Sequence, residues 1–127
     1  MISYWEDLNV KKKVVIGGCR NYTDYAFFKS HLDEILKSER DEIVIISGHC
    51  SGVDIMGERY AAENGFTVEI FPAEWRKYGR AAGPIRNEKM VDMADLVIAF
   101  WDGKSKGTKS LIKYTERTGK ALIRIVI

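Results

Sequence analysis

The sequence predicts an α/β fold, a three-layer Rossmann-like sandwich built on a five-stranded parallel sheet. Two observations predict it. Short runs rich in Val, Ile and Phe alternate along the 127 residues with segments of helical periodicity. These runs are continuously apolar rather than alternating, which is typical of parallel strands covered on both faces. Parallel neighbours need crossover connections, so the intervening helices should cover both sides of the sheet.

Five apolar runs bounded by turn residues are the predicted strands. They are residues Lys13–Gly17, Glu42–Ser47, Thr67–Phe71, Leu96–Phe100 and Ala121–Val126. None approaches the roughly 20 apolar residues that cross a bilayer. We therefore expect no membrane contact.

Four apolar stripes at helical spacing lie between the strands. The stripes are Phe28, Leu32, Ile35 and Leu36; Val53, Met56, Gly57, Tyr60 and Ala61; Met90, Met93 and Ala94; and Leu111, Ile112 and Thr115. The second stripe fits the pattern of an amphipathic helix. A further short helix beginning at Ser3 would pack Trp5 and Leu8 on the domain.

Helix-end signals agree with these stripes. Asp24 can cap the first helix, and Ser51 with Asp54 three residues later resembles a capping box. Gly65 and Gly119 stand where C-terminal glycines belong. The helix boundaries are therefore predicted independently of the apolar periodicity.

Length and composition fit one domain over residues 1–127, in which residues 1–12 form a short N-terminal extension. The chain is 46% hydrophobic and 30% charged, as is ordinary for a globular protein. Its first ten residues lack the apolar core of a secretory signal, so we expect a cytoplasmic protein. A net charge of +2 does not by itself indicate a nucleic-acid partner.

The distribution of charge points to an anionic ligand. In sheets of this kind ligands bind outside the carboxyl ends of the strands, here residues 18–24, 48–54, 72–90 and 101–109. These segments hold nine bases and five acids, against eleven bases and thirteen acids elsewhere. The alternative is that loops are simply charged. Because basic residues are concentrated in these segments and acidic residues are not, we favour an anionic small molecule as partner.

Glycines at three strand-to-helix turns favour a phosphate. Gly17–Gly18, Gly48 with Gly52, and Gly103 with Gly107 follow the first, second and fourth strands. Glycine lets the backbone approach a ligand closely, and a helix N-terminus offers unpaired amides to phosphate. Neither a Walker loop nor a G-x-G-x-x-G sequence is present, which disfavours a P-loop or a standard dinucleotide site.

The third connection, residues 72–90, is long and combines aromatic residues with bases. Trp75 or Tyr78 can stack on a base, although Trp75 can equally cover the sheet as core. Arg80 or Arg86 can take a phosphate through two hydrogen bonds. We expect Arg86 to open a helix, where a cation opposes the helix dipole, which favours a ligand as its partner.

These observations give one set of candidate ligand-binding residues. The set is Gly18, Arg20, Gly48, Ser51, Gly52, Asp54, Trp75, Arg80, Arg86, Asn87, Asp102, Ser105, Gly107 and Thr108. Asp54 or Asp102 is the candidate for a ribose hydroxyl, and Asp54 can instead support its helix N-terminus. Ser105 and Thr108 can also cap the last helix.

Several ordered motifs resemble the YspA-like branch of the SLOG superfamily over residues 13–126. The motifs are Gly17–Arg20 with Asp24, Ser47–Asp54, Pro72–Trp75, Gly79–Asn87 with Met90, and Trp101–Thr108. The resemblance implies a Rossmann-like fold with strand order 3-2-1-4-5, a nucleotide or nucleotide-derived ligand, and a role as ligand sensor. No cofactor is required. Relatives often pair as dimers, so a homodimer is the expected assembly.

The same superfamily includes the Lonely Guy phosphoribohydrolases and the DNA-processing protein DprA. These relatives suggest two alternative functions, hydrolysis of nucleotides and binding of nucleic acid. The hydrolases pair an arginine with the glutamate of P-G-G-x-G-T-x-x-E. Arg86 and Met90 keep the spacing of the arginine motif, so Arg86 is the catalytic candidate if the chain is an enzyme. Lys109, Ser110 and Leu111 follow Gly107–Thr108, so the glutamate is missing. That loss makes hydrolysis doubtful unless Asp54, Glu58 or Asp102 substitutes.

Two other classes of site remain open. By analogy with DprA, the basic third connection could stack single-stranded bases, but the modest net charge makes a nucleic-acid partner less favoured. Cys19, His49, Cys50 and Asp54 could ligate zinc, yet no C-x-x-C or H-x-x-x-H spacing supports it. Buried thiols explain the cysteines more simply, and no metal is expected.

Overall fold

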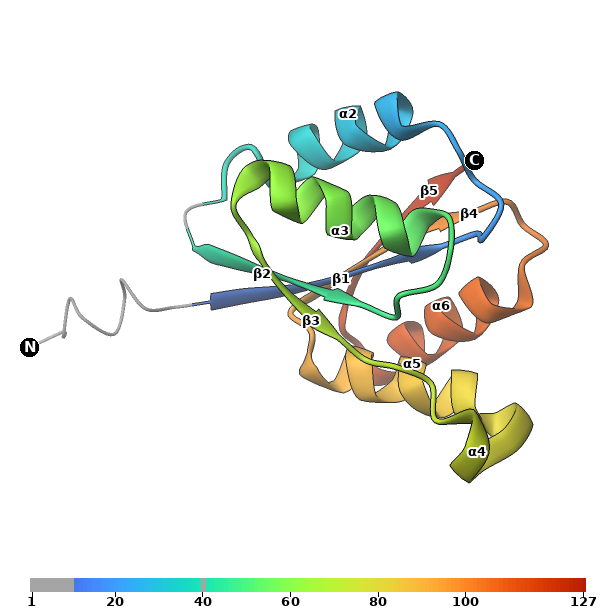
Figure 1. The fold of residues 1–127 in the computed structure, drawn as a ribbon. Helices are drawn as coiled ribbons and strands as arrows, with labels where there is room; N and C mark the ends of the chain where they lie inside the picture. The colour runs from blue at the N-terminus through green and yellow to red at the C-terminus, as the bar shows by residue number, and fades with distance from the viewer. Residues whose placement is uncertain (1–10, 40) are drawn as a thin grey trace, which may run out of the picture.

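The computed structural model describes residues 11–39 and 41–127. A five-stranded, wholly parallel sheet forms its centre, and its strands, numbered along the chain, lie in the order 3-2-1-4-5. Helices lie on both faces, as Figure 1 shows. The predicted fold class and strand order are therefore confirmed. The proposed helix near Ser3 lies outside the described residues.

The strands are β1 (Lys11–Gly18), β2 (Glu42–Ser47), β3 (Thr67–Ile70), β4 (Leu96–Trp101) and β5 (Ala121–Val126). β1 begins two residues before the predicted strand because Lys11 and Lys12 pair with Glu42 and Ile43 of β2. The three central strands are buried, as continuous apolar runs predict. The edge strands β3 and β5 remain largely half-exposed, so the expectation of two covered faces is wrong for them.

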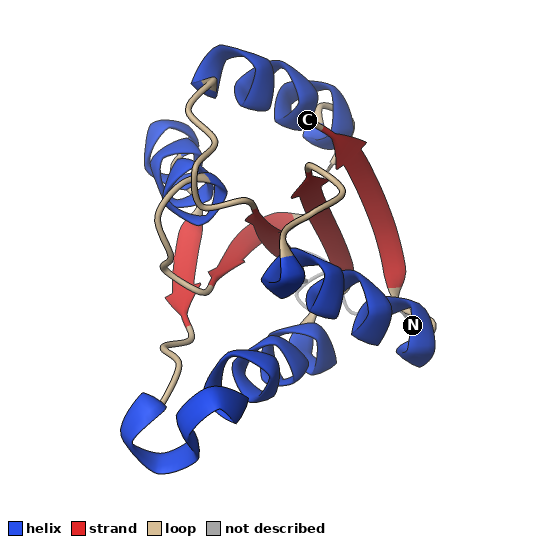
Figure 2. Cartoon of the chain, turned by 90° about the vertical axis from the view of Figure 1, so that its right-hand side faces the viewer, coloured by secondary structure: helices blue, strands red, loops and turns tan. Residues whose placement is uncertain are grey.

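Helices α2 (Tyr25–Leu36) and α3 (Val53–Asn64) cover one face, and α5 (Ala82–Met93) and α6 (Lys106–Thr118) cover the other. Figure 2 shows the sheet between the two helical layers. Successive strand residues point to opposite faces, so Val14 packs under α2 and α3 while Val15 packs under α5 and α6. Both side chains are completely buried.

Three of the predicted helix-end residues act as the sequence signals indicate. The Asp24 carboxylate accepts the amide of Phe27, and Gly65 and Gly119 adopt the left-handed conformation at their C-caps. The predicted capping box at Ser51 is wrong. Gly52 occupies the N-cap of α3 without a side-chain bond, because the Ser51 hydroxyl donates to the Arg20 carbonyl 3.3 Å away.

Most of the third connection is helical rather than a long loop. After β3 the chain forms the short helix α4 (Trp75–Tyr78) and the 3-10 turn η1 (Gly79–Ala81), and α5 begins at once with Ala82. Arg86 therefore lies in the second turn of α5, and the expectation that it opens a helix is wrong. Across the described ranges, no helix has the length and apolar character needed to cross a membrane.

Candidate functional site

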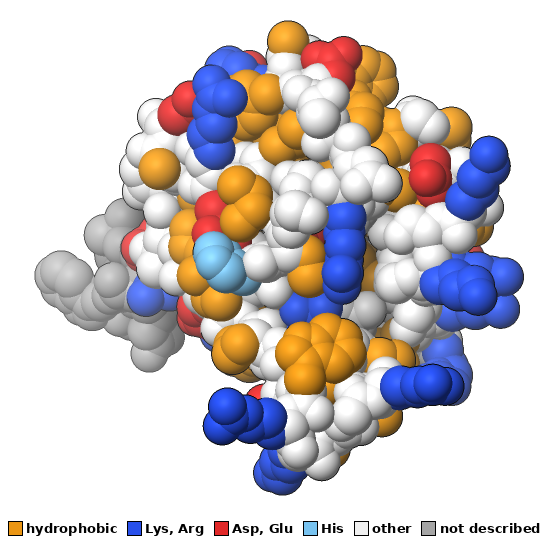
Figure 3. Space-filling model, turned by 45° about the vertical axis from the view of Figure 1, so that its right-hand side comes forward, with side chains coloured by type: hydrophobic (Ala, Val, Ile, Leu, Met, Phe, Trp, Pro, Cys, Tyr) orange, Lys and Arg blue, Asp and Glu red, His pale blue; other side chains and the backbone are white. Residues whose placement is uncertain are grey.

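A groove lies where the carboxyl ends of the central strands meet the N-termini of the helices. Its inner part, which we call the inner hollow, has a volume of about 160 Å³. Eight predicted residues line it: Gly18, Arg20, Asp54, Arg86, Asn87, Ser105, Gly107 and Thr108. Figure 3 shows Lys and Arg side chains along the rim of this end of the molecule and within its hollowed centre. The topology thus brings together predicted residues up to 90 positions apart, from Gly18 to Thr108.

A second depression, the outer hollow, adjoins the first and has a volume of about 300 Å³. The two share Arg20, Cys50 and Arg86 as lining residues, so they form one continuous groove. Gly48, Ser51 and Trp75 line the outer hollow, together with His49 and an apolar wall from the segment after β3. Trp75 is 54% exposed, so it does not cover the sheet as core.

Arg86 is a buried cation whose hydrogen-bond acceptors in the described ranges are all neutral. Only 8% of the residue is exposed. Its Nη1 donates to the carbonyl of Gly48 at 2.8 Å, and its Nε donates to Asn87 Oδ1 at 3.2 Å. These neutral acceptors hold the guanidinium in place. Within the described part of the chain no carboxylate forms an ion pair with it, although the Asp54 charge is close enough to interact.

Asp54 is the buried carboxylate of the inner hollow, with 7% of its surface exposed. It accepts the backbone amide of Cys50 at 3.2 Å. Burial raises the pKa of Asp54 to about 6, while the amide of Cys50 and the charge of Arg86 act in the opposite direction. The protein therefore holds a carboxyl group that changes charge near neutral pH beside a fixed positive charge.

The N-terminus of α6 forms the other wall of the inner hollow. Thr108 is buried, and its hydroxyl lies 3.2 Å from that of Ser105, which occupies the N-cap position. Neither side chain makes the predicted capping bond to an amide. The Asn87 Nδ2 donates to the Gly107 carbonyl at 3.3 Å and so joins α5 to α6. As at any helix start, the first amides of α6 have no partner within the helix.

Close backbone packing explains the glycine at two turns. A Cβ on Gly18 would lie 2.4 Å from the carbonyl oxygen of Phe100, and one on Gly52 would lie 2.3 Å from that of Cys19. Gly52 also has a φ of +78°, which side chains rarely allow. Gly52 thus allows the turn before α3 to pack closely against the backbone of Cys19, and it does not line either hollow.

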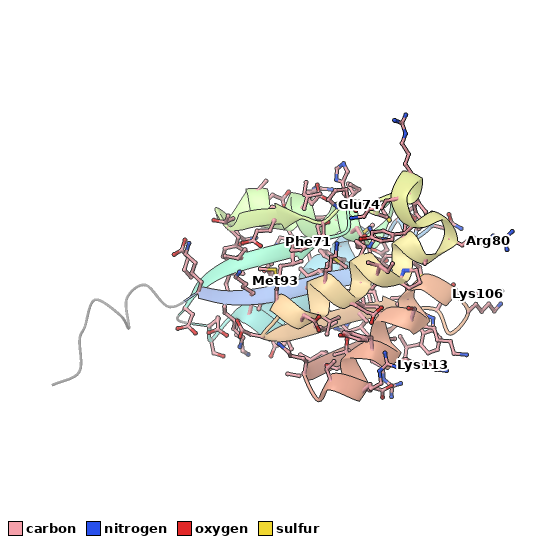
Figure 4. All side chains as sticks on the ribbon, turned by 90° about the horizontal axis from the view of Figure 1, so that it is seen from below. Phe71, Glu74, Arg80, Met93, Lys106 and Lys113 are labelled. Carbon is pink, nitrogen blue, oxygen red and sulfur yellow. The ribbon has the colours of Figure 1, made fainter. Side chains whose placement is uncertain are left out.

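Two further predicted residues lie away from the groove. The Asp102 carboxylate accepts the amides of Lys104 and Ser105 at 2.8 and 2.9 Å, and these bonds lower its pKa. It lines a separate depression beside β5. Arg80 is exposed on η1 and projects from the end of the molecule beyond α5, as Figure 4 shows.

Several groove residues are absent from the predicted set. Met90 and Leu111 line the inner hollow as apolar floor, and their helical stripes had indicated only core. His49 lines the outer hollow, where its ring contacts Glu58. A histidine directly after a strand-end glycine is a visible signal, but the contact with Glu58 depends on the course of α3 and cannot be read from spacing.

The comparison with known proteins decides the family. Residues 12–78 match the model of the YspA, cpYpsA-related SLOG family. The chain belongs to this family. It is also 30% identical over 118 residues to the Gene 61 protein of Mycobacterium phage D29, an alignment that covers 88% of this chain and 94% of that protein. The resemblance to the YspA-like branch of the SLOG superfamily is therefore confirmed.

Two solved structures share the fold of this SLOG protein. DNA processing protein A (DprA) from Streptococcus pneumoniae superimposes with a TM-score of 0.71 at 17% identity, over 92% of this chain and 50% of that one. The protein TM1055 gives a TM-score of 0.64 at 21% identity, over 89% of this chain and 72% of that one. The chain spans about half the length of DprA. At these identities the likeness concerns the fold alone.

The family match covers only part of the groove. Arg20, Gly48, Asp54 and Trp75 lie within residues 12–78 of this SLOG protein. Arg86 and the α6 wall lie outside that range, so the contacts of α5 and α6 with the groove come from the structure itself.

Proposed function

We propose that this SLOG protein binds a phosphate-bearing, nucleotide-derived small molecule in the groove. The observation that carries the proposal is the meeting of Arg20, the buried Arg86 and the start of α6 in one hollow. Family membership supports the same class of ligand.

Electrostatics favour an anion there. Burying a cation is costly unless nearby negative charge compensates it. Arg86 has only neutral hydrogen-bond acceptors within the described residues, and the nearby Asp54 carboxyl group, whose pKa burial raises to about 6, forms no ion pair with it. An anionic ligand would add to this compensation. Arg20 is exposed at the same hollow and makes no side-chain hydrogen bond or ion pair to residues 11–39 or 41–127, so it is free to contact the ligand.

The start of α6 is the natural position for the phosphate. Its first turn contains no acidic residue and carries Lys106 and Lys109. Unpaired amides and the helix dipole both attract an anion at such a position. The hydroxyls of Ser105 and Thr108 add hydrogen-bond donors, and Asp54 across the hollow can accept a hydroxyl of the ligand.

Identification of a co-purified molecule tests the proposal. The purified protein is denatured, and the released small molecules are measured by mass spectrometry. We expect a phosphate-bearing molecule from the wild type and a much smaller amount from the Arg20→Ala, Arg86→Met double variant, with folding checked by circular dichroism. An uncharged molecule, or equal amounts from both folded proteins, would contradict the proposal.

The second candidate is hydrolysis of an N-glycosidic bond, and Asp54 is the observation that favours it. The glutamate expected after Thr108 is missing, as Lys109, Ser110 and Leu111 show. Asp54 supplies a carboxyl group in the same hollow with a pKa raised by burial to about 6, within the useful range for acid–base catalysis. Release of free base from nucleoside monophosphates, lost in both Asp54→Asn and Arg86→Met, would establish this activity. No release from a nucleotide panel would exclude it.

A further inference from the structure

His49 has a backbone conformation that suggests a function. Its φ of 59° makes it the sole non-glycine residue with a positive φ in the described part of the chain. A residue with a Cβ rarely adopts this conformation, and such strain gathers at functional sites. The His49 amide donates to Ser47 Oγ at 3.0 Å, which holds the turn in place.

A chain of hydrogen bonds fixes the His49 ring. The buried Ser47 hydroxyl donates to Glu58 Oε2 at 2.7 Å. The same carboxylate lies 2.8 Å from His49 Nδ1. The Glu58 side chain is 19% exposed, whereas that of His49 is 57% exposed. The carboxylate is thus held at the protein surface with its oxygens directed at the imidazole.

The contact with Glu58 decides how the ring can act. An ionised carboxylate only accepts hydrogen bonds, so Nδ1 carries the hydrogen. In the neutral ring Nε2 then keeps its lone pair. No hydrogen bond to Nε2 forms within residues 11–39 and 41–127, and the ring lines the outer hollow. An oriented, polar ring atom is therefore available to a molecule in that hollow.

An apolar wall lies across the same hollow. Ile70 and Trp75 are 48% and 54% exposed, and Pro72 and Ala73 lie between them in the chain. Exposed apolar side chains beside fixed polar groups are typical of ligand pockets. An indole prefers a flat partner, since ring faces stack. The outer hollow thus offers a surface for a ring face and a polar atom for a ring edge.

We propose that the outer hollow is a subsite for a planar heteroaromatic ring, with Trp75 against its face and His49 Nε2 at its polar edge. Glu58 is a positioning residue that acts through His49. The inference rests on the proposed function, because the phosphate of the same molecule would occupy the inner hollow. The shared lining residues Arg20 and Arg86 give the two groups one continuous groove.

Calorimetric titration separates the two hollows. Ribose 5-phosphate tests the inner hollow alone, and the four common nucleoside 5′-monophosphates test both. We expect the best nucleotide to bind about tenfold or more tightly than ribose 5-phosphate, as a stacked base contributes. Trp75→Ala and His49→Asn should reduce this ratio towards one and leave ribose 5-phosphate binding unchanged. Asparagine tolerates a positive φ, so the second variant should fold.

Glu58→Gln tests the positioning role. We expect it to reduce the nucleotide-to-ribose-phosphate ratio and to change the ¹⁵N chemical shifts of the His49 ring, because the amide no longer fixes the hydrogen on Nδ1. Glu63→Gln is the matched control, because it is the same change on the same helix at a carboxylate that contacts Tyr25 and Arg59 outside the groove, and it should keep both.

The outcomes distinguish this inference from the proposed function. Equal binding of ribose 5-phosphate and all four nucleotides would overturn the ring subsite while the phosphate site stands. A nucleotide advantage that survives both His49→Asn and Trp75→Ala would also overturn it. No binding of any of the five compounds would overturn the proposed function and this inference with it.

Discussion

Asp54→Asn should stabilise the free protein at pH 8, although Asp54 belongs to the groove. Burial raises the pKa of Asp54 from its ordinary value of 3.8 to about 6. A carboxyl group with a raised pKa in the folded state favours folding while it is protonated, and this contribution is lost as pH rises from about 4 through about 6. Each pKa unit corresponds to about 1.4 kcal/mol, so ionisation of Asp54 costs the fold about 3 kcal/mol at most.

Asparagine removes this cost and keeps an oxygen to accept the amide of Cys50. Arg86 loses a favourable neighbouring charge, which offsets part of the gain. The expected increase in the free energy of unfolding at pH 8 is therefore about 1–3 kcal/mol.

Urea unfolding of wild type and Asp54→Asn at pH 8 and pH 4 measures this effect. The stability difference should be present at pH 8 and small at pH 4, where the carboxyl group of the folded wild type is protonated and that of the unfolded chain, with its ordinary pKa of 3.8, is only partly ionised. Asp41→Asn, at an exposed position, is the control and should change little at either pH. An Asp54→Asn protein that is less stable than wild type at pH 8, or a difference independent of pH, would refute the reasoning.

Three further predictions concern the groove. Gly18→Ala should destabilise the fold by several kcal/mol in thermal unfolding, because its Cβ would lie 2.4 Å from the Phe100 carbonyl, whereas Gly107→Ala has nothing within 4 Å and should be tolerated. Arg20→Ala should weaken ribose 5-phosphate binding roughly tenfold in calorimetry with an unchanged melting temperature, because the side chain is exposed. Arg86→Met should abolish binding of ribose 5-phosphate. It should also lower the free energy of unfolding by about 1–3 kcal/mol, because buried carbonyls lose their hydrogen-bond donor. An unchanged melting curve would contradict the contacts described.

The sequence predicted the strands well because their apolar runs record burial directly. β2 and β5 have the predicted bounds. The edge position of β3 and β5 was not predicted, because the β-branched residues of Thr67–Ile70 and Ala121–Val126 suggested buried strands, although Glu69 and Arg124 interrupt these two runs. Strand order came from the resemblance to known proteins, since periodicity carries no information on neighbours.

The site was predicted as a set of loops but not as a set of contacts. The rule that ligands bind at the carboxyl ends of strands correctly brought Arg20, Asp54 and Thr108 to one hollow. Local signals failed where a competing partner exists in the fold. Ser51 bonds to the Arg20 carbonyl instead of capping α3. Helix α5 begins at Ala82, so Arg86 lies in its second turn and not at its start. Both the hydrogen-bond partner and the helix start depend on tertiary packing, which spacing along the chain does not encode.

The most direct test of the anionic groove is a ¹H–¹⁵N NMR titration with ribose 5-phosphate. We predict the largest saturable changes at the amides of Gly18, Gly107 and Thr108, with the Arg20→Ala protein needing higher concentrations to reach them. Saturable changes confined to surfaces away from the inner hollow, or no change at millimolar concentration, would contradict the account.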